Sequence, residues 1–133
     1  MGTATQQIQQ AVYGVLSTDA ALLALVPGMY DEVPENRTFP YLVLGDATET
    51  PLDTFARKGR IATITVSIYS MQKGFKESLT IADRVDVLLN RNSFNLSTYD
   101  TVYTMYKMLS TQRMGDGLTR KVDIKYDVFA EER

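Results

Sequence analysis

Two aspartates three residues apart, Asp83 and Asp86, are the side chains whose type and spacing come closest to a chemical site. Residues three apart on a helix lie near one face, and two carboxylates on one face can hold a divalent cation. Arg84 lies between them, and the sequence offers no third ligand. The pattern therefore favours a solvated helix face over a metal or catalytic site.

A glycine-containing segment, Gly115-Asp116-Gly117, is the second candidate. Loops that cradle phosphate lead into a helix, whose N-terminus binds the anion. An alternating strand pattern follows here instead. The segment therefore predicts a hairpin turn of the Asp-Gly kind.

Three further groups could bind macromolecules. The basic cluster of Arg57, Lys58 and Arg60 is either a solvated loop or a contact for an acidic neighbour or nucleic acid. Three tyrosines could stack on bases, but no basic groove accompanies them, so sheet packing is favoured. Three methionines fit core filling and a subunit interface equally well, because methionine adapts to packed surfaces. These residues are Tyr99, Tyr103, Tyr106, Met105, Met108 and Met114.

The sequence contains no cysteine and no histidine. These two absences exclude disulfides, thiol nucleophiles, thiolate metal ligands, Ser-His-Asp triads and ordinary zinc sites. An enzyme would depend on carboxylates, lysine, tyrosine or a bound ion. We therefore predict no catalytic residue, no metal and no cofactor.

Length and charge bound the remaining classes. The 133 residues predict a single domain spanning residues 1–133, with enough chain to bury a core. The net charge of −2 argues against non-specific binding to nucleic acid. No apolar run approaches the ~20 residues that a bilayer requires, and the N-terminus lacks a signal-peptide pattern, so no membrane association is expected.

Hydrophobic periodicity predicts the element order α-α-β-β-α-β-β. The fold class is α+β, a small antiparallel or mixed four-stranded sheet with helices packed on one face. Helices are expected over residues 4–16 and 75–89, with a short helix capped by Asp19 between the first helix and the strands. Strands are expected over residues 41–46, 61–69, 99–114 and 118–130. The polar residues 47–60 predict a long arm between the first two strands, mobile in a free subunit.

Three details follow from the same patterns. Thr3 and Gln6 have the spacing of a capping box. The buried stripe of the second long helix is expected to comprise Phe75, Leu79, Ala82, Val85 and Leu89. The strand over residues 99–114 is apolar on both faces, which predicts a cover on both sides, one of them a second subunit. Its expected faces are Val102, Tyr106 and Met108 on one side, with Tyr103, Met105 and Leu109 on the other.

The order of several segments resembles the tail-completion or tail-terminator family of long-tailed bacteriophages and prophages. The resemblance covers nearly the whole chain and rests on four features. These are Asp19-Ala-Ala-Leu-Leu-Ala-Leu-Val-Pro-Gly28 after the first helix, Tyr30 followed by Phe39-Pro-Tyr-Leu-Val-Leu-Gly45, Thr63-Ile-Thr-Val-Ser-Ile-Tyr-Ser70 leading through Gly74 into Ser78–Val85, and Arg113 with Asp116-Gly117-Leu-Thr119.

The resemblance implies a structural virion protein with no catalytic residues. It implies a homo-oligomeric ring, generally a hexamer, that caps the head-proximal end of the tail tube, ends tube elongation and joins tail to head. The implied partners are other copies of the chain, the tail tube protein and the head connector or stopper, with genome DNA passing through without sequence-specific binding. The implied location is the virion tail, after assembly in the host cytoplasm.

Two alternatives stay open. Within the same class, the chain is a head-completion or connector protein of the neck. From another class, it is a small-ligand-binding α+β domain or a carboxylate-dependent enzyme. The expected interface residues are those of the arm, where a basic limb approaches an acidic patch of the neighbouring subunit or of the tube. They are Glu49, Asp53, Phe55, Arg57, Lys58 and Arg60.

Overall fold

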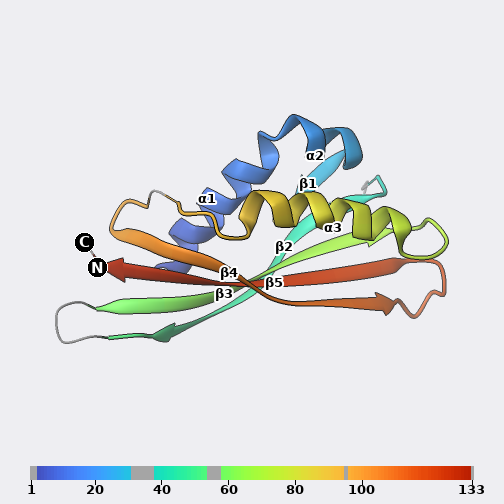
Figure 1. Cartoon of the computed structure of the whole chain (residues 1–133). Helices are drawn as coiled ribbons and strands as arrows, with labels where there is room; N and C mark the ends of the chain where they lie inside the picture. The colour runs from blue at the N-terminus through green and yellow to red at the C-terminus, as the bar shows by residue number, and fades with distance from the viewer. Residues whose placement is uncertain (1–2, 31–37, 54–57, 95, 133) are drawn as a thin grey trace.

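Three helices lie on one side of a twisted five-stranded sheet (Figure 1). The computed structural model describes residues 3–30, 38–53, 58–94 and 96–132. The helices are α1 (Thr5–Ser17), α2 (Ala20–Leu25) and α3 (Lys76–Leu89). The strands are β1 (Gly28–Tyr30), β2 (Tyr41–Pro51), β3 (Gly59–Ser70), β4 (Tyr99–Arg113) and β5 (Arg120–Glu132).

The strand order across the sheet is β1-β2-β3-β5-β4. β1 runs parallel to β2, and every other neighbouring pair is antiparallel. The α+β class, the mixed sheet and the helices on one face are confirmed, whereas the count of four strands is wrong. The strand that was missed, β1, has three residues and directly follows Pro27, so it is too short to show alternation.

Much of the described part of the predicted arm over residues 47–60 is strand, since residues 47–51 belong to β2 and residues 59–60 to β3, while residues 54–57 lie outside the described ranges. Pairing of β2 with β3 continues from Ala47 opposite Ile64 to Pro51 opposite Arg60, after a bulge between Leu44 and Ala47. The backbone N–H of Leu52 donates to the carbonyl of Gly59 at 2.8 Å and closes the hairpin. This end of β2 is polar and partly exposed, so no apolar alternation marked it as strand.

The core lies between the helices and the inner face of β3 and β5. Both strands alternate, so that every second side chain enters the core. Burying each large aliphatic side chain of this kind contributes about 1.5–3 kcal/mol. The buried set includes Ile64, Val66, Ile68, Val122, Ile124, Tyr126 and Val128 from the sheet, with Ile8, Val12, Leu16, Leu22, Ile81, Val85 and Leu89 from the helices.

The two helix N-termini in the first part of the chain are capped in different ways. Asp19 caps α2 as expected, because its Oδ2 accepts the backbone N–H of Leu22 at 2.9 Å. The capping box predicted at Thr3 is wrong, since Ala4 is the N-cap of α1 and makes no side-chain cap. Glu49 of β2 supplies the carboxylate instead and accepts the backbone N–H of Thr5 at 2.8 Å. A carboxylate there also interacts favourably with the helix dipole.

The buried stripe of α3 is rotated from the expected one. Ala82, Val85 and Leu89 are buried as expected, but Ser78 and Ile81 are buried too, and Phe75 and Leu79 are only partly covered. The Ser78 hydroxyl donates to the carbonyl of Phe75 at 3.2 Å. A serine satisfied in this way can be buried, which periodicity of apolar residues does not reveal.

Candidate interaction surfaces

The two aspartates of α3 point to different surroundings and do not form a site together. Asp83 is exposed. Asp86 accepts a hydrogen bond from the Tyr126 hydroxyl at 2.8 Å, so it does not lie on a purely solvated face as expected. Arg84, between them, donates from Nε and Nη2 to the two oxygens of Asp19, each at 2.8 Å. Within the described ranges, no group of three acidic side chains is placed to hold a metal ion.

These contacts tie the helices to the sheet and to each other. Tyr126 is completely buried, and burial, followed by the hydrogen bond to Asp86, raises the pKa of its phenol above the usual range. The Arg84 guanidinium holds the pKa of Asp19 below its usual value. The charged residues of α3 that face inward therefore act as structural links between α2, α3 and β5.

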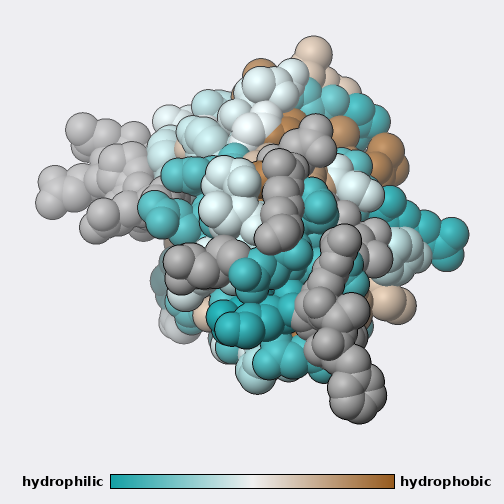
Figure 2. Space-filling view, turned by 90° about the vertical axis from the view of Figure 1, so that its left-hand side faces the viewer, coloured by the Kyte–Doolittle hydropathy of each residue, from teal (hydrophilic) through white to brown (hydrophobic). Residues whose placement is uncertain are grey.

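The end of the β2–β3 hairpin carries the residues expected at an interface. Glu49 Oε2 lies 3.7 Å from Arg60 Nε on the neighbouring strand of the same chain. Asp53 Oδ1 accepts the backbone N–H of Gly59 at 3.3 Å, and Lys58 is exposed. Phe55 and Arg57 lie outside the described residues. The view onto this end of the molecule is mainly hydrophilic (Figure 2).

The predicted hairpin turn at residues 115–117 is confirmed. Gly117 has a φ of +73°, which glycine adopts without a steric cost. Asp116 Oδ1 accepts the backbone N–H groups of Leu118 and Thr119 at 2.9 and 2.8 Å. The hydrogen bonds from Thr119, its amide first and then its hydroxyl, lower the pKa of Asp116 to about 2. These hydrogen bonds hold the turn that connects β4 to β5, so the segment has a structural role.

Strand β4 is one of the two outer strands of the sheet, opposite β1, and exposes large apolar side chains. Register shifts occur between Thr101 and Tyr103 and again between Tyr106 and Met108. Each shift inserts one residue and changes the face that follows. The expected division of faces is therefore wrong: Tyr103, Met105 and Met108 lie opposite Phe129, Asp127 and Lys125 on the face away from the helices.

The exposed fractions show that these side chains are uncovered. Met105 is 46% exposed, Met108 is 47% and Tyr103 is 36%. Tyr106 is 45% exposed and lies on the helix side, with its ring edge-on to Tyr126 at 6.1 Å between centroids. Both faces of β4 thus carry large apolar groups open to solvent. Tyr103 and Tyr106 lie on opposite faces and Tyr99 is buried, so the three tyrosines form no stacking platform.

The outer edge of β4 is partly closed by the segment that follows α3. The backbone N–H of Arg91 donates to the carbonyl of Thr104 at 2.7 Å. The backbone N–H of Tyr106 donates to Asn90 Oδ1 at 3.0 Å. Backbone groups at this point are satisfied, which protects the edge against indiscriminate strand pairing. Contacts at residues 103–108 therefore depend on side chains.

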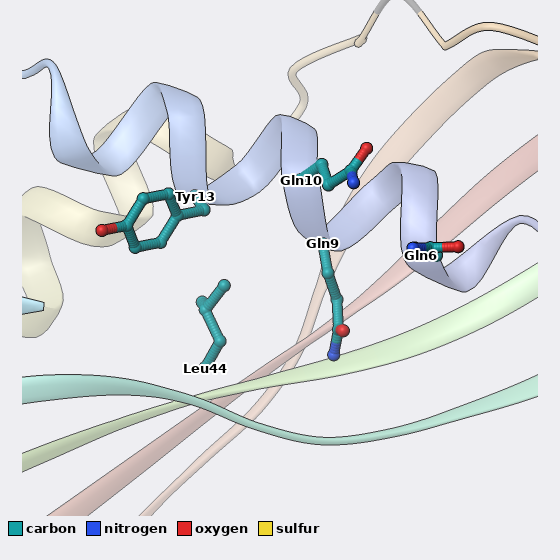
Figure 3. Close-up of a pocket in the computed structure, with 5 residues that line it drawn as sticks. All are labelled: Gln6, Gln9, Gln10, Tyr13 and Leu44. Carbon is teal, nitrogen blue, oxygen red and sulfur yellow. The ribbon is translucent and has the colours of Figure 1, made fainter. Parts of the chain in front are cut away.

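A groove of about 380 Å³ lies between α1 and β2, toward the edge of the sheet that is opposite β4 (Figure 3). Tyr13 of α1 and Leu44 of β2 face one another across it, with Gln6, Gln9 and Gln10 along the helix. The lining side chains that the structure describes are all uncharged. Small-molecule sites combine an apolar cleft with convergent polar groups. Among these described residues the groove offers amides and one phenol, but no titratable pair suited to acid-base chemistry.

The middle of the sheet face away from the helices is polar, and its aspartates are paired. Asp123 accepts the Ser67 hydroxyl at 2.6 Å and lies 3.6 Å from Lys121. Asp127 accepts the Thr63 hydroxyl at 2.6 Å and lies 3.5 Å from Lys107. These links between β3, β5 and β4 use the carboxylates for the cohesion of the sheet.

The outer strand β4 carries four exposed large apolar side chains, and the aspartates on the polar face of β5 are paired. Among the helices described, none is long and apolar enough to cross a membrane. A comparison with curated protein sequences finds no match. The sequence profile described as tail completion protein gp17 matches residues 10–131. The chain therefore belongs to the tail completion protein gp17 family, and its role is structural, in the completion of a phage tail.

Two solved structures share the fold. A chain in the virion of a native gene transfer agent particle matches with a TM-score of 0.90 and 24% sequence identity, over 98% of this chain and 99% of that chain. The bacteriophage SPP1 gp17 protein matches with a TM-score of 0.59 and 22% identity, over 98% of this chain and 91% of that one. The fold is thus shared with two proteins of very different sequence.

Sequence reasoning missed two features of these surfaces. The bidentate contact between Arg84 and Asp19 joins residues 65 positions apart, and no local pattern indicates it. The bulges of β4, which gather Tyr103, Met105 and Met108 on one face, were also missed. A break in strict alternation along residues 101–109 is the signal that could have indicated a bulge.

Proposed function

We propose that this chain forms a closed ring of identical subunits at the head-proximal end of a phage tail tube, where the ring ends tube elongation and joins the tail to the head. The observation that carries the proposal is β4, an outer strand with Tyr103, Met105, Tyr106 and Met108 each at least 36% exposed. Contiguous exposed apolar groups of this size mark protein interfaces. The family supports a place for that interface in the tail.

The proposed partners are other copies of the chain, the tail tube protein and the head connector or stopper. A hexamer is the proposed ring size, with DNA passing through it without sequence-specific contacts, and assembly takes place in the host cytoplasm before the subunit enters the virion. No catalytic activity is proposed, because four carboxylates serve structural hydrogen bonds, those of Asp86, Asp116, Asp123 and Asp127.

The hairpin end is the proposed second contact, with the neighbouring subunit or with the tube. Glu49 and Arg60 lie close together within the chain, so their charges are partly neutralised before any partner arrives. Lys58 and Asp53 are exposed and remain suited to pairing. Such rim pairs contribute about 0–1 kcal/mol each and mainly set register and encounter rate. Phe55 and Arg57 belong to the same proposed contact.

The test combines the purified chain with tail tubes that lack a terminator. Electron microscopy is expected to show rings at one end of the tubes, and tube polymerisation in the presence of the chain is expected to stop at a defined length. Tubes that grow without limit and carry no density at either end would contradict the proposal. Binding of the chain to heads in the absence of tails would support a neck protein instead.

A further inference from the structure

The first thirty residues present an unusually uncharged surface. They contain a single charged side chain, Asp19, although 23% of the whole chain is charged. Asp19 is already bonded through both oxygens to Arg84. The exposed side chains of α1 and α2 therefore carry no free charge, and they include Tyr13 at 42%, Leu23 at 48% and Leu25 at 38% exposure. The cores of protein interfaces are depleted of charge and enriched in aromatic residues in this way.

The groove of this surface, between Tyr13 and Leu44, lies at the side of the sheet opposite β4, whereas Gln7 of the same helix is hydrogen-bonded to Thr98 just before β4. β1 and β2 form one side of the sheet and β4 forms the other. β1 pairs with β2 only from Tyr41 to Val43, and the groove between Tyr13 and Leu44 opens just beyond that pairing. Among the described residues, the subunit therefore has two different surfaces without free charge, one at each edge of the sheet.

The exposed part of β4 matches this surface in chemistry. Residues 101–106 and 108–112 contain no charged side chain. Lys107, the one charge between them, contacts Asp127 of its own chain at 3.5 Å. Tyr106 projects on the helix side with 45% of its surface exposed, so it is an aromatic group that the helices of its own chain do not fully cover.

We propose that β4 of one subunit packs against the uncharged α1–α2 surface of the next, with Tyr106 seated in the groove between Tyr13 and Leu44. This inference rests on the proposed ring and names the two surfaces that build it. Because the surfaces differ and lie at opposite edges, each subunit contacts one neighbour through β4 and the other neighbour through the groove of its α1–α2 surface. This is the head-to-tail arrangement that closes rings. Amides of Gln6, Gln9 and Gln10 are available to the tyrosine hydroxyl, since amide groups both donate and accept.

The absence of cysteine makes the contact directly testable by cross-linking. The test variant combines Tyr106→Cys with Gln10→Cys, on β4 and on the exposed side of α1. The matched control combines Tyr106→Cys with Val87→Cys, on α3, where Val87 is 70% exposed. A short bismaleimide is expected to give a ladder of covalent oligomers with the test variant. The control pair and both single-cysteine variants are expected to stay monomeric on a denaturing gel.

Sedimentation of the same samples before cross-linking separates this inference from the proposed function. If rings form but the test variant gives no ladder, or the control variant gives one, the assignment of the two surfaces is wrong. The proposal of a ring would still hold in that case. No oligomer in solution or on tail tubes, for the wild type, would contradict the ring itself. A covalent dimer from Tyr106→Cys alone would indicate a two-fold contact between β4 strands and would also overturn the inference.

A second measurement does not depend on cysteine. Tyr106→Ala is expected to weaken subunit association at least about tenfold, because buried aromatic anchors dominate interfaces. Val87→Ala on α3 is expected to leave association unchanged. The ratio of association between the wild type and Tyr106→Ala is expected to change little with sodium chloride concentration, since this contact is uncharged. A ratio that changes steeply with salt, or equal association of Tyr106→Ala and Val87→Ala, would contradict the assignment.

Discussion

The centre of the sheet and its β4 edge are both built from apolar strands, but only the centre is covered by helices of its own chain. Val66 of β3 and Val128 of β5 are completely buried beneath the helices. Met105 and Met108 of β4 keep nearly half of their surface exposed. The comparison teaches that an apolar pattern indicates a surface to be covered, without telling whether the same chain or a second copy supplies the cover.

The largest expected effect lies at the centre. Val66→Asp, or Val85→Asp on α3, places an unpaired charge in a fully buried position, at a cost of several kcal/mol, and should abolish folding. Thr65→Asp is the matched control on the other face of β3, where it lies opposite Lys125. Circular dichroism and thermal melting check both. Cooperative melting of Val66→Asp near the wild-type temperature would break the comparison.

The link between the helix layer and β5 should give a smaller and asymmetric effect. Asp86→Ala leaves the buried Tyr126 hydroxyl without its acceptor and should lower the free energy of unfolding by about 1–3 kcal/mol. Tyr126→Phe removes the hydroxyl together with its need for a partner and should cost less. Urea unfolding of the two variants and of the double variant gives the coupling energy. A harmless Asp86→Ala would mean that the aspartate is solvated after all.

The N-terminal cap of α1 should give an effect of similar or smaller size. Glu49→Ala removes the carboxylate that accepts from Thr5 and should lower stability by about 0.5–2 kcal/mol, as the loss of a helix cap does. Glu49→Gln retains an acceptor and should cost less. If both variants unfold like the wild type while subunit association is lost, Glu49 acts at the interface and its contact with α1 is unimportant for the fold.

The β4–β5 turn should give the smallest effect, visible as a pH dependence. The pKa of Asp116 is lowered to about 2 from 3.8, so its ionised form stabilises the folded state. That contribution is complete above pH 3.8 and is lost as pH falls through about 2. The difference in melting temperature between wild type and Asp116→Asn should therefore shrink across this window. A difference that stays constant from neutral pH to pH 2 would contradict the role of the ionised carboxylate.

Much of the helix-covered half could be predicted from the sequence. β3 and β5 alternate strictly because one face is buried and the other polar, and α1 and α3 repeat apolar residues at helical spacing. The Asp19 cap and the Asp116 turn depend on contacts within a few residues, so local chemistry predicted both.

The features at the sheet edges could not be predicted in the same way. The end of β2 over residues 47–51 is held by pairing with β3 and is not buried by the helices, so its polar sequence indicated a loop. The cap of α1 comes from Glu49, 44 residues away in the chain. The faces of β4 depend on two bulges, each of which reverses the alternation that follows. Long-range pairing determines all three.

The interface residues expected on the arm illustrate the same limit. A charge-based arrangement between subunits was expected from the order of acidic and basic residues. The structure places Glu49 beside Arg60 within one chain, while the uncharged surfaces lie on β4 and on α1 and α2. A role for the hairpin end in assembly stays a prediction, and its contribution should be recognised by its sensitivity to salt.

The most direct test of the central claim is the state of association of a variant altered only on β4. Met105→Asp combined with Met108→Asp changes two exposed side chains on the face away from the helices. Val87→Asp on α3 is the control with a comparable exposed apolar residue. Sedimentation and native mass spectrometry should show a folded monomer with wild-type melting for the double variant, and rings for the control and the wild type. Rings of normal size from the double variant would contradict the claim that β4 is the assembly surface.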